Sequence, residues 1–97
     1  MKLKKYKTKD DIRRLLDIKH LDCIVCNHPA PSDAHHITEC GRRLGDDYTI
    51  PLCFDCHRGK NGFAGKNRGA WDKSLANQLI LLERTNLELK HFRASFI

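Results

Sequence analysis

Residues 22–62 read DCIVCNHPAPSDAHHITECGRRLGDDYTIPLCFDCHRGKNG, and a C-x2-C pair stands near each end of this segment. Four thiolates from two such pairs make up the tetrahedral ligand set that zinc prefers in structural sites. A pair of redox cysteines is the alternative, but no thioredoxin-like βαβ pattern surrounds either pair. The spacing therefore predicts one structural Zn2+ held by Cys23, Cys26, Cys53 and Cys56.

The segment between the two pairs, residues 27–52, is longer than in the commonest zinc ribbons, so we expect it to contain a structural unit of its own. The whole chain, residues 1–97, is predicted to form one domain. A core this small benefits from a further constraint such as a bound metal. The fifth cysteine, Cys40, is expected to be a small apolar side chain rather than a further ligand.

The rest of the chain predicts a small α+β fold around this zinc-stapled segment. Residues 34–38 and 48–52 have the composition of short strands, and a short helix is expected to begin at Phe54. Apolar residues at helical spacing predict a helix on each side of the segment. The predicted parts are a basic arm (1–9), a helix (9–20) with Ile12, Leu15 and Leu16, the core (22–62), and a long helix (71–93) with Leu75, Leu79, Leu82, Leu89 and Phe92.

Positive charge dominates the chain. Eighteen Lys and Arg residues oppose twelve Asp and Glu residues, which gives a formal charge of +6 and a pI near 9.2. This balance favours a polyanionic partner such as nucleic acid. No apolar run is long enough to cross a membrane and no secretory signal is recognised, so we expect a cytoplasmic protein with reduced cysteines and no membrane partner.

Three of the four histidines in the zinc segment, His35, His36 and His57, stand on a predicted strand or directly after a cysteine pair, although a four-cysteine site has no use for them. His57 and Asn61 are four residues apart, so on a helix they would share one face and could bind one metal ion. His35 and His36 are adjacent and would point to opposite sides of a regular strand, so both can face that ion only if the strand ends or bulges there. These residues predict a second metal site.

The succession of CIVC (23–26), AHHIT (34–38) and DDYTIPLCFDCHRGKNG (46–62) resembles the HNH endonucleases of the ββα-metal, or His-Me finger, fold. The likeness is strongest to small phage and prophage members of the Ref-like recombination-enhancement type, and it spans about residues 23–70. In that family a hairpin and one helix clasp a catalytic divalent ion, and a separate zinc holds the unit together. The resemblance implies a phage-encoded DNA endonuclease linked to recombination or DNA processing.

The resemblance also implies roles for individual residues. His36 would be the general base that deprotonates the attacking water, and His35 and His57 would bind the catalytic ion, with Asn61 completing the site. A neutral histidine suits the base role at cellular pH. Imidazole ligands favour Zn2+, Ni2+ or Mn2+, while an open site with bound water is compatible with Mg2+.

The chain departs from the family pattern at two positions. The central Asn is missing, and Asp47 or Tyr48 occupies its neighbourhood; we assign Asp47 to orient the base. Ala64 stands where relatives are expected to carry a histidine, and alanine can neither bind metal nor donate a proton. These departures motivate the alternative of a noncatalytic, zinc-ribbon-like nucleic-acid-binding module.

DNA is the expected partner, with a recombinase or another phage DNA-processing protein as a further candidate. Basic side chains around the proposed site would bind the phosphate backbone and would therefore read little sequence. The predicted DNA-binding residues are Arg42, Arg43, Arg58, Lys60, Lys66 and Arg68.

Overall fold

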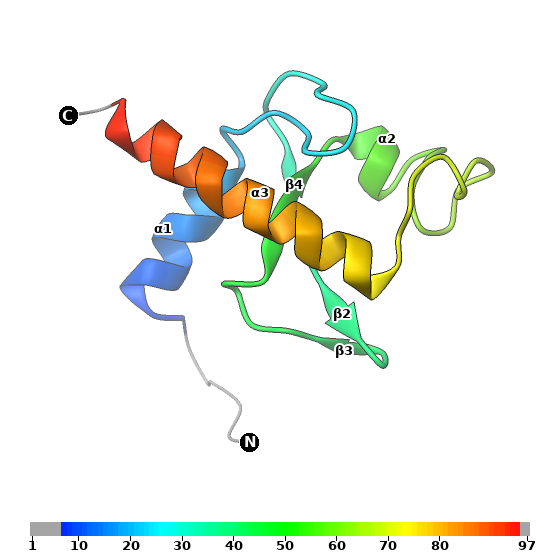
Figure 1. Cartoon of the computed structure of the whole chain (residues 1–97), viewed down its shortest axis with the longest axis horizontal. Helices are drawn as coiled ribbons and strands as arrows, with labels where there is room; N and C mark the ends of the chain where they lie inside the picture. Colours follow the sequence, from blue (N-terminus) through cyan, green and yellow to red (C-terminus); the bar gives the residue numbers. More distant parts are fainter. Residues whose placement is uncertain (1–6, 96–97) are drawn as a thin grey trace.

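The computed structural model describes residues 7–95 as a small α+β fold, which confirms the predicted fold class at that level (Figure 1). Lys2, Lys4 and Lys5 of the predicted basic arm lie outside the described residues. The elements are α1 (Lys9–Ile18), β1 (Asp33–His36), β2 (Thr38–Glu39), β3 (Arg42–Arg43), β4 (Thr49–Leu52), α2 (Phe54–His57) and α3 (Leu75–Ala94).

Helix α1 begins with a capping box. The Thr8 hydroxyl accepts a hydrogen bond from the Asp11 backbone N–H at 3.1 Å, and the Asp11 carboxylate accepts one from the Thr8 backbone N–H at 3.0 Å. The helix ends at Ile18, two residues earlier than predicted. Ile18 is fully buried, but Ile12 and Leu16 are exposed, so the expected apolar stripe is not the face that packs.

Strands β1 and β4 pair antiparallel, with His35 opposite Ile50 and His36 opposite Thr49. They correspond to the two predicted strands at 34–38 and 48–52, with boundaries shifted by one or two residues. Every residue of β4 is buried, whereas β1 is half-buried along its length. The sheet therefore holds its histidine-bearing strand close to the surface.

Strands β2 and β3 form a second small hairpin, which takes up Thr38 from the end of the predicted strand 34–38 and the first part of the predicted loop 39–47. Its turn consists of Cys40 and Gly41, whose φ angles are 52° and 78°. Two consecutive positive φ angles are typical of the two-residue turns that match strand twist, and glycine adopts them without steric strain. Cys40 is exposed at this turn, so the predicted packing role as a small apolar side chain is wrong.

Helix α3 begins at Leu75, four residues later than predicted, because the Ser74 hydroxyl caps it by accepting a hydrogen bond from the Asn77 N–H at 3.2 Å. The predicted apolar stripe is also partly wrong, since Leu79 is exposed. The polar residues Gln78 and Thr85 are buried in its place, and both side chains have hydrogen-bond partners. The buried residues of α3 are Gln78, Leu81, Leu82, Thr85 and Leu89.

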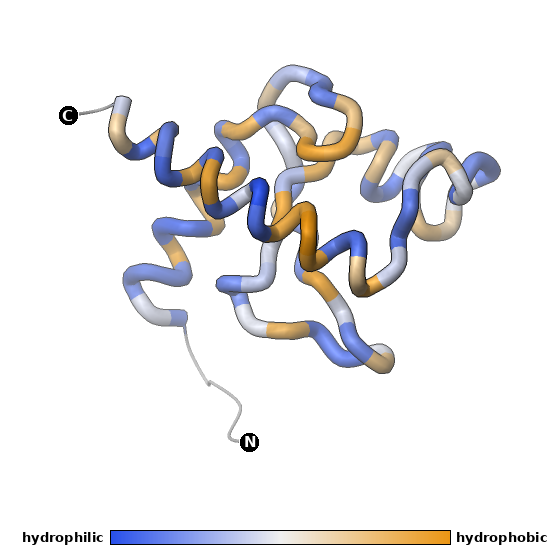
Figure 2. The backbone as a smooth tube through the Cα atoms, in the orientation of Figure 1, coloured by the Kyte–Doolittle hydropathy of each residue, from blue (hydrophilic) through white to orange (hydrophobic). Residues whose placement is uncertain are grey.

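Two clusters of buried side chains hold these elements together. The larger one joins Cys23, Cys53 and Cys56 to Ile37, Ile50 and the first half of α3. This half is the more hydrophobic part of the helix, and it crosses β4 (Figure 2). The smaller one joins α1 to the second half of α3 through Ile18 and Leu89. None of the described helices combines the length and the apolar character needed to cross a membrane.

The smaller cluster predicts a position-specific loss of stability. Leu89 is 2% exposed, so Leu89→Ala should lower the free energy of unfolding by about 2–5 kcal/mol through lost burial and a residual cavity. Leu87 on the same helix is 53% exposed, and Leu87→Ala should change the free energy of unfolding by no more than ~0.5 kcal/mol. Urea unfolding of both variants at a fixed zinc concentration measures the difference, and equal losses would contradict this packing.

Candidate metal centre and histidine cluster

The first cysteine pair sits in a tight backbone turn. The Asn27 N–H donates to the Cys23 carbonyl at 2.9 Å, and Asn27 adopts a φ of 63°, a left-handed conformation that asparagine tolerates. The Ile24 N–H donates to the Pro51 carbonyl of β4 at 3.0 Å. This bond ties the turn to the strand that leads directly into the second pair.

The four predicted zinc ligands converge. The sulfur atoms of the four cysteines all lie within 4.8 Å of one another, and the Cys26 and Cys53 sulfurs are 3.6 Å apart. Two sulfurs bound to one tetrahedral zinc lie about 3.8 Å apart, given a Zn–S bond of about 2.3 Å. Cys23, Cys53 and Cys56 are buried, while Cys26 is exposed. The cluster could therefore hold a metal ion such as zinc.

The surroundings of the four thiols differ. Burial by itself would raise the pKa of the Cys23 thiol, but backbone N–H groups of Cys26, Cys53 and Val25 donate to its sulfur and lower that pKa below its ordinary value. For Cys56, burial raises the pKa, and the neighbouring cysteines raise it further. A cation bound among the sulfurs would favour the thiolate form of all four, because metal ligands must be deprotonated.

On one face of β1, His35 lies against His57 from the end of α2. Their ring centroids are 5.1 Å apart, with the rings in an edge-to-face arrangement. Phe63 stacks on His35 with ring centroids 4.7 Å apart. Gly62 allows this contact, because a Cβ at that position would overlap the His57 carbonyl oxygen and push the following chain away from α2. The structure thus brings His35 and His57 together, as the sequence predicted for one site.

Hydrogen bonds fix which ring nitrogens of this pair are free. The Gln78 amide donates to the Lys73 carbonyl at 2.8 Å, so its oxygen faces His35 and accepts from His35 Nε2 at 3.0 Å. His57 Nδ1 donates to the Asp33 carboxylate at 2.9 Å. In the neutral form of each ring, the lone pair therefore lies on His35 Nδ1 and on His57 Nε2, where a metal ion could bind.

Two pKa shifts accompany these contacts. Burial is the main reason that the pKa of His35 falls to about 4, so its ring is neutral near pH 7. The hydrogen bond from His57 is the main reason that the pKa of Asp33 lies below its usual range. A neutral imidazole beside an ionised carboxylate suits cation binding. In residues 7–95, however, the four cysteines form the one group of three or more Cys, His or acidic residues able to hold a metal.

His36 makes different contacts from those of His35. Its Nε2 lies 2.6 Å from Asp46 Oδ1, and the Arg43 guanidinium donates to its Nδ1 at 2.8 Å. A guanidinium has no acceptor, so Nδ1 carries the lone pair and Nε2–H donates to Asp46. Adjacent strand residues point to opposite faces, which explains why His35 and His36 share no partner.

The acid beside His36 differs from the predicted one by one residue. Asp46 contacts His36, and a hydrogen bond from Lys7 is the main reason that the pKa of Asp46 lies below its ordinary value. Asp47 instead lines the cleft between α1 and α3. The two carboxylates are consecutive, but the loop before β4 places them on different sides of the chain, so only Asp46 reaches His36.

Asn61 does not have the helical relation to His57 that the sequence suggested. Helix α2 ends at His57, and the Asn61 backbone N–H donates back to the Asp55 carbonyl at 2.9 Å. The shared helix face is therefore absent, although the role of Asn61 as a ligand stays a prediction. Ala64 is exposed in the same loop, one residue after the phenylalanine that stacks on His35.

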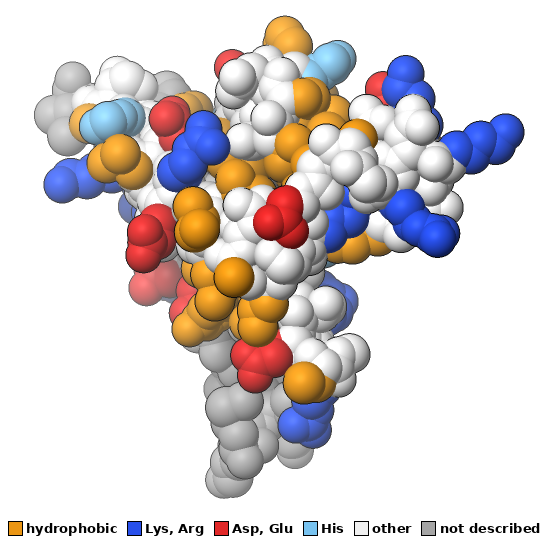
Figure 3. Space-filling model, turned by 45° about the vertical axis from the view of Figure 1, so that its right-hand side comes forward, with side chains coloured by type: hydrophobic (Ala, Val, Ile, Leu, Met, Phe, Trp, Pro, Cys, Tyr) orange, Lys and Arg blue, Asp and Glu red, His pale blue; other side chains and the backbone are white. Residues whose placement is uncertain are grey.

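The predicted DNA-binding residues are all exposed. Arg42 and Arg43 form β3, and the others lie in the loop after α2, the side from which several Lys and Arg side chains project in Figure 3. Arg58 is partly engaged, because its Nε lies 3.3 Å from Asp33 Oδ2. The exposure of all six side chains is compatible with a role in binding. Their partner stays a prediction.

Comparisons with models of known protein families, with curated proteins and with solved structures find no match.

Three side chains that hydrogen-bond to His35, His36 or His57 were not predicted from the sequence: Asp33, Asp46 and Gln78. Asp33 carried a usable signal, since it lies two residues before His35 on a strand and so shares its face. Gln78 carried none, because nothing in a helical pattern marks which polar residue will meet a distant histidine.

The cysteine geometry predicts one zinc ion per chain. Cys53→Ser should remove that zinc and lower thermal stability sharply, because a structural metal contributes directly to folding free energy. Cys40→Ser is the matched control, since Cys40 is exposed and outside the cluster, and it should retain full zinc content. Elemental analysis after gel filtration provides the measurement. The assignment would be refuted if the purified wild-type chain contained no zinc and had the same melting temperature as Cys53→Ser.

Proposed function

We propose that this protein is a metal-dependent HNH-type DNA endonuclease that hydrolyses phosphodiester bonds with little sequence specificity. The observation that carries the proposal is the approach of His57, from α2, to His35, on β1, with ring centroids 5.1 Å apart. Strands β1 and β4 followed by α2 would then form the ββα-metal unit, with the cysteine cluster as its structural zinc site. The order and contacts of these elements support the family resemblance found in the sequence.

His35 Nδ1 and His57 Nε2 would hold the catalytic ion, with Asn61 as a further ligand. The hydrogen bonds to Gln78 and Asp33 are made by the other nitrogen of each ring, so in the neutral rings these two nitrogens carry the lone pairs. Mg2+, Mn2+, Ni2+ and Zn2+ remain the candidate ions. When bound, such an ion supplies positive charge that stabilises the oxygen leaving phosphorus.

His36 would take the proton from the attacking water through Nδ1, the nitrogen that carries its lone pair. Asp46 accepts from Nε2–H and so holds the ring in that tautomer. Arg43 now donates to Nδ1 and is also a predicted phosphate-binding residue. Movement of its guanidinium onto a phosphate oxygen would release Nδ1 when DNA binds. The exposed basic residues around the site would hold the backbone without reading sequence.

A noncatalytic nucleic-acid-binding module is the second candidate. One observation favours it: the contacts of His36 and His35 lie on different faces of β1. A base and a metal must act on the same phosphate, so a nuclease would need the end of β1 to rearrange. Under this alternative the histidines have structural roles, and DNA binding persists without cleavage.

Plasmid nicking separates the two candidates. Supercoiled DNA incubated with the chain and Mg2+, Mn2+, Ni2+ or Zn2+ should be nicked, and His36→Ala should slow nicking roughly 10²–10⁴-fold, the usual contribution of a general base. His57→Ala should raise the metal concentration needed for half-maximal rate. His91→Ala, an exposed histidine on α3, is the matched control and should nick at the wild-type rate.

Zinc content and DNA affinity of each variant should be measured in parallel, so that a folding defect is recognised. Wild-type nicking that survives His36→Ala unchanged would remove His36 as the base. No nicking with any of the four metals, together with intact DNA binding, would establish the binding-module alternative instead.

The Asp46 contact generates a separate prediction. Asp46→Asn should lower the cleavage rate at saturating DNA by up to roughly 10⁴-fold, because an amide in place of the carboxylate that orients a histidine base favours the wrong tautomer of the ring. DNA binding should be unchanged or tighter, since a negative charge is removed. Asp10→Asn, an exposed acid at the start of α1, is the charge-matched control. A cleavage rate for Asp46→Asn equal to that of the control would exclude the orienting role.

A further inference from the structure

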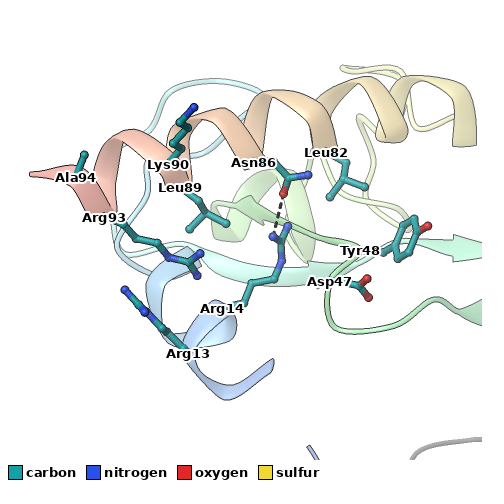
Figure 4. A pocket seen from close by; sticks show the side chains of 10 residues that line it. All are labelled: Arg13, Arg14, Asp47, Tyr48, Leu82, Asn86, Leu89, Lys90, Arg93 and Ala94. Atoms are coloured by element: carbon teal, nitrogen blue, oxygen red, sulfur yellow. Dashed lines mark hydrogen bonds between the residues drawn. The ribbon is translucent and has the colours of Figure 1, made fainter. Parts of the chain in front are cut away.

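A cleft of about 870 Å³ lies between α1 and α3, with the loop before β4 at one end. None of the predicted DNA-binding residues lines it. Figure 4 shows the guanidinium groups of Arg13, Arg14 and Arg93 in the space between the two helices, with Asp47 and Tyr48 at the far end of the row. The cleft is therefore a second basic surface, distinct from β3 and from the loop after α2.

Positive charge is in excess along this cleft. Among residues 7–95, the basic side chains that line it are Arg13, Arg14, Lys90 and Arg93, and Asp47 is the one acidic lining residue. A second carboxylate, Asp17, is shared by two of the arginines: its Oδ2 lies 2.9 Å from Arg93 Nε and 3.6 Å from Arg13 Nε. Both contacts use Nε, so the terminal nitrogens of Arg13 and Arg93 keep their donors for another partner.

Within residues 7–95, no carboxylate makes an ion pair with Arg14, although the charge of Asp47 acts on it from further away. Its Nε and one terminal nitrogen donate to Thr49, and the other terminal nitrogen donates to Asn86 Oδ1 at 2.9 Å. These contacts use three of the five guanidinium N–H groups, which leaves two. Burial is the main reason that the pKa of Arg14 lies below its ordinary value. An anion entering the cleft would compensate this half-buried charge.

The same cleft adjoins the loop that holds His36. Thr49, which accepts from Arg14 Nε, stands opposite His36 in the β1–β4 register. Asp46 contacts His36, while the next residue, Asp47, lines the cleft. Tyr48 is 39% exposed and presents an aromatic face on which a base could stack. Closely spaced cations beside an exposed aromatic ring suit a nucleic-acid strand better than an isolated small anion.

We propose that the α1–α3 cleft binds the sugar–phosphate backbone of a nucleic-acid strand, with Arg13, Arg14, Lys90 and Arg93 as phosphate ligands. This site adds a second contact surface to the one predicted from the sequence. It stands independently of catalysis, because a chain that binds without cleaving would use it equally.

The test compares two double variants that remove equal charge, each with one change in α1 or at its C-cap and one change in α3. Arg13→Gln with Lys90→Gln changes two exposed cleft residues, while Lys19→Gln with Arg84→Gln changes two exposed residues that do not line the cleft. Arg14 is left intact because it connects β4 to α3. Affinity for a labelled 20-base-pair DNA is measured by fluorescence anisotropy over a series of salt concentrations, with no divalent metal added, to prevent cleavage, and with zinc content checked for each variant.

The cleft variant should bind the duplex roughly tenfold more weakly, and the slope of log affinity against log salt should flatten by about two, one for each lost phosphate contact. The control pair should change affinity by less than about twofold. Equal losses in the two variants would overturn the proposal, since net charge alone would then explain binding. Unlabelled DNA and polyglutamate are also added as competitors at equal charge concentration. If polyglutamate displaces the labelled DNA as effectively as unlabelled DNA does, the proposal is overturned in favour of an acidic protein partner.

Discussion

The convergence of four cysteine sulfurs is the constraint on which the rest of this structure depends. Three of these cysteines belong to the larger cluster of buried side chains, so the metal-binding group and the hydrophobic core are parts of one packed unit. Strand β4 runs directly into Cys53, and α2 carries Cys56 followed at once by His57. A metal bound to the sulfurs would thus also set the position of His57 relative to β1.

Strand alternation divides the histidines between two environments. His35 faces α2 and α3, where burial keeps it neutral, while His36 contacts a carboxylate and a guanidinium nearer the surface. A single strand can supply both a metal ligand and a base only if the two faces meet at its end. The proposed catalysis therefore depends on the last residues of β1, and the cleft beside Thr49 would hold DNA next to that point.

Much of the local structure was predictable because its causes are local. The two strands and both long helices follow from residue composition and periodicity, and capping groups such as Ser74 then decide where a helix starts. The errors have a common origin. Leu79 satisfied the helical pattern yet is exposed, whereas Gln78 is buried because the His35 ring lies opposite it.

By itself, the sequence determined the cysteine spacing, the strand that carries adjacent histidines, and the positive charge, since each is a property of neighbouring residues or of composition. Only the tertiary structure decided that Asp46 rather than Asp47 meets His36, and that Arg14 joins Thr49 to Asn86. The partners of Arg14 lie 35 and 72 positions away along the chain. Such contacts arise from the packing of α1, β4 and α3 together, which no local pattern encodes.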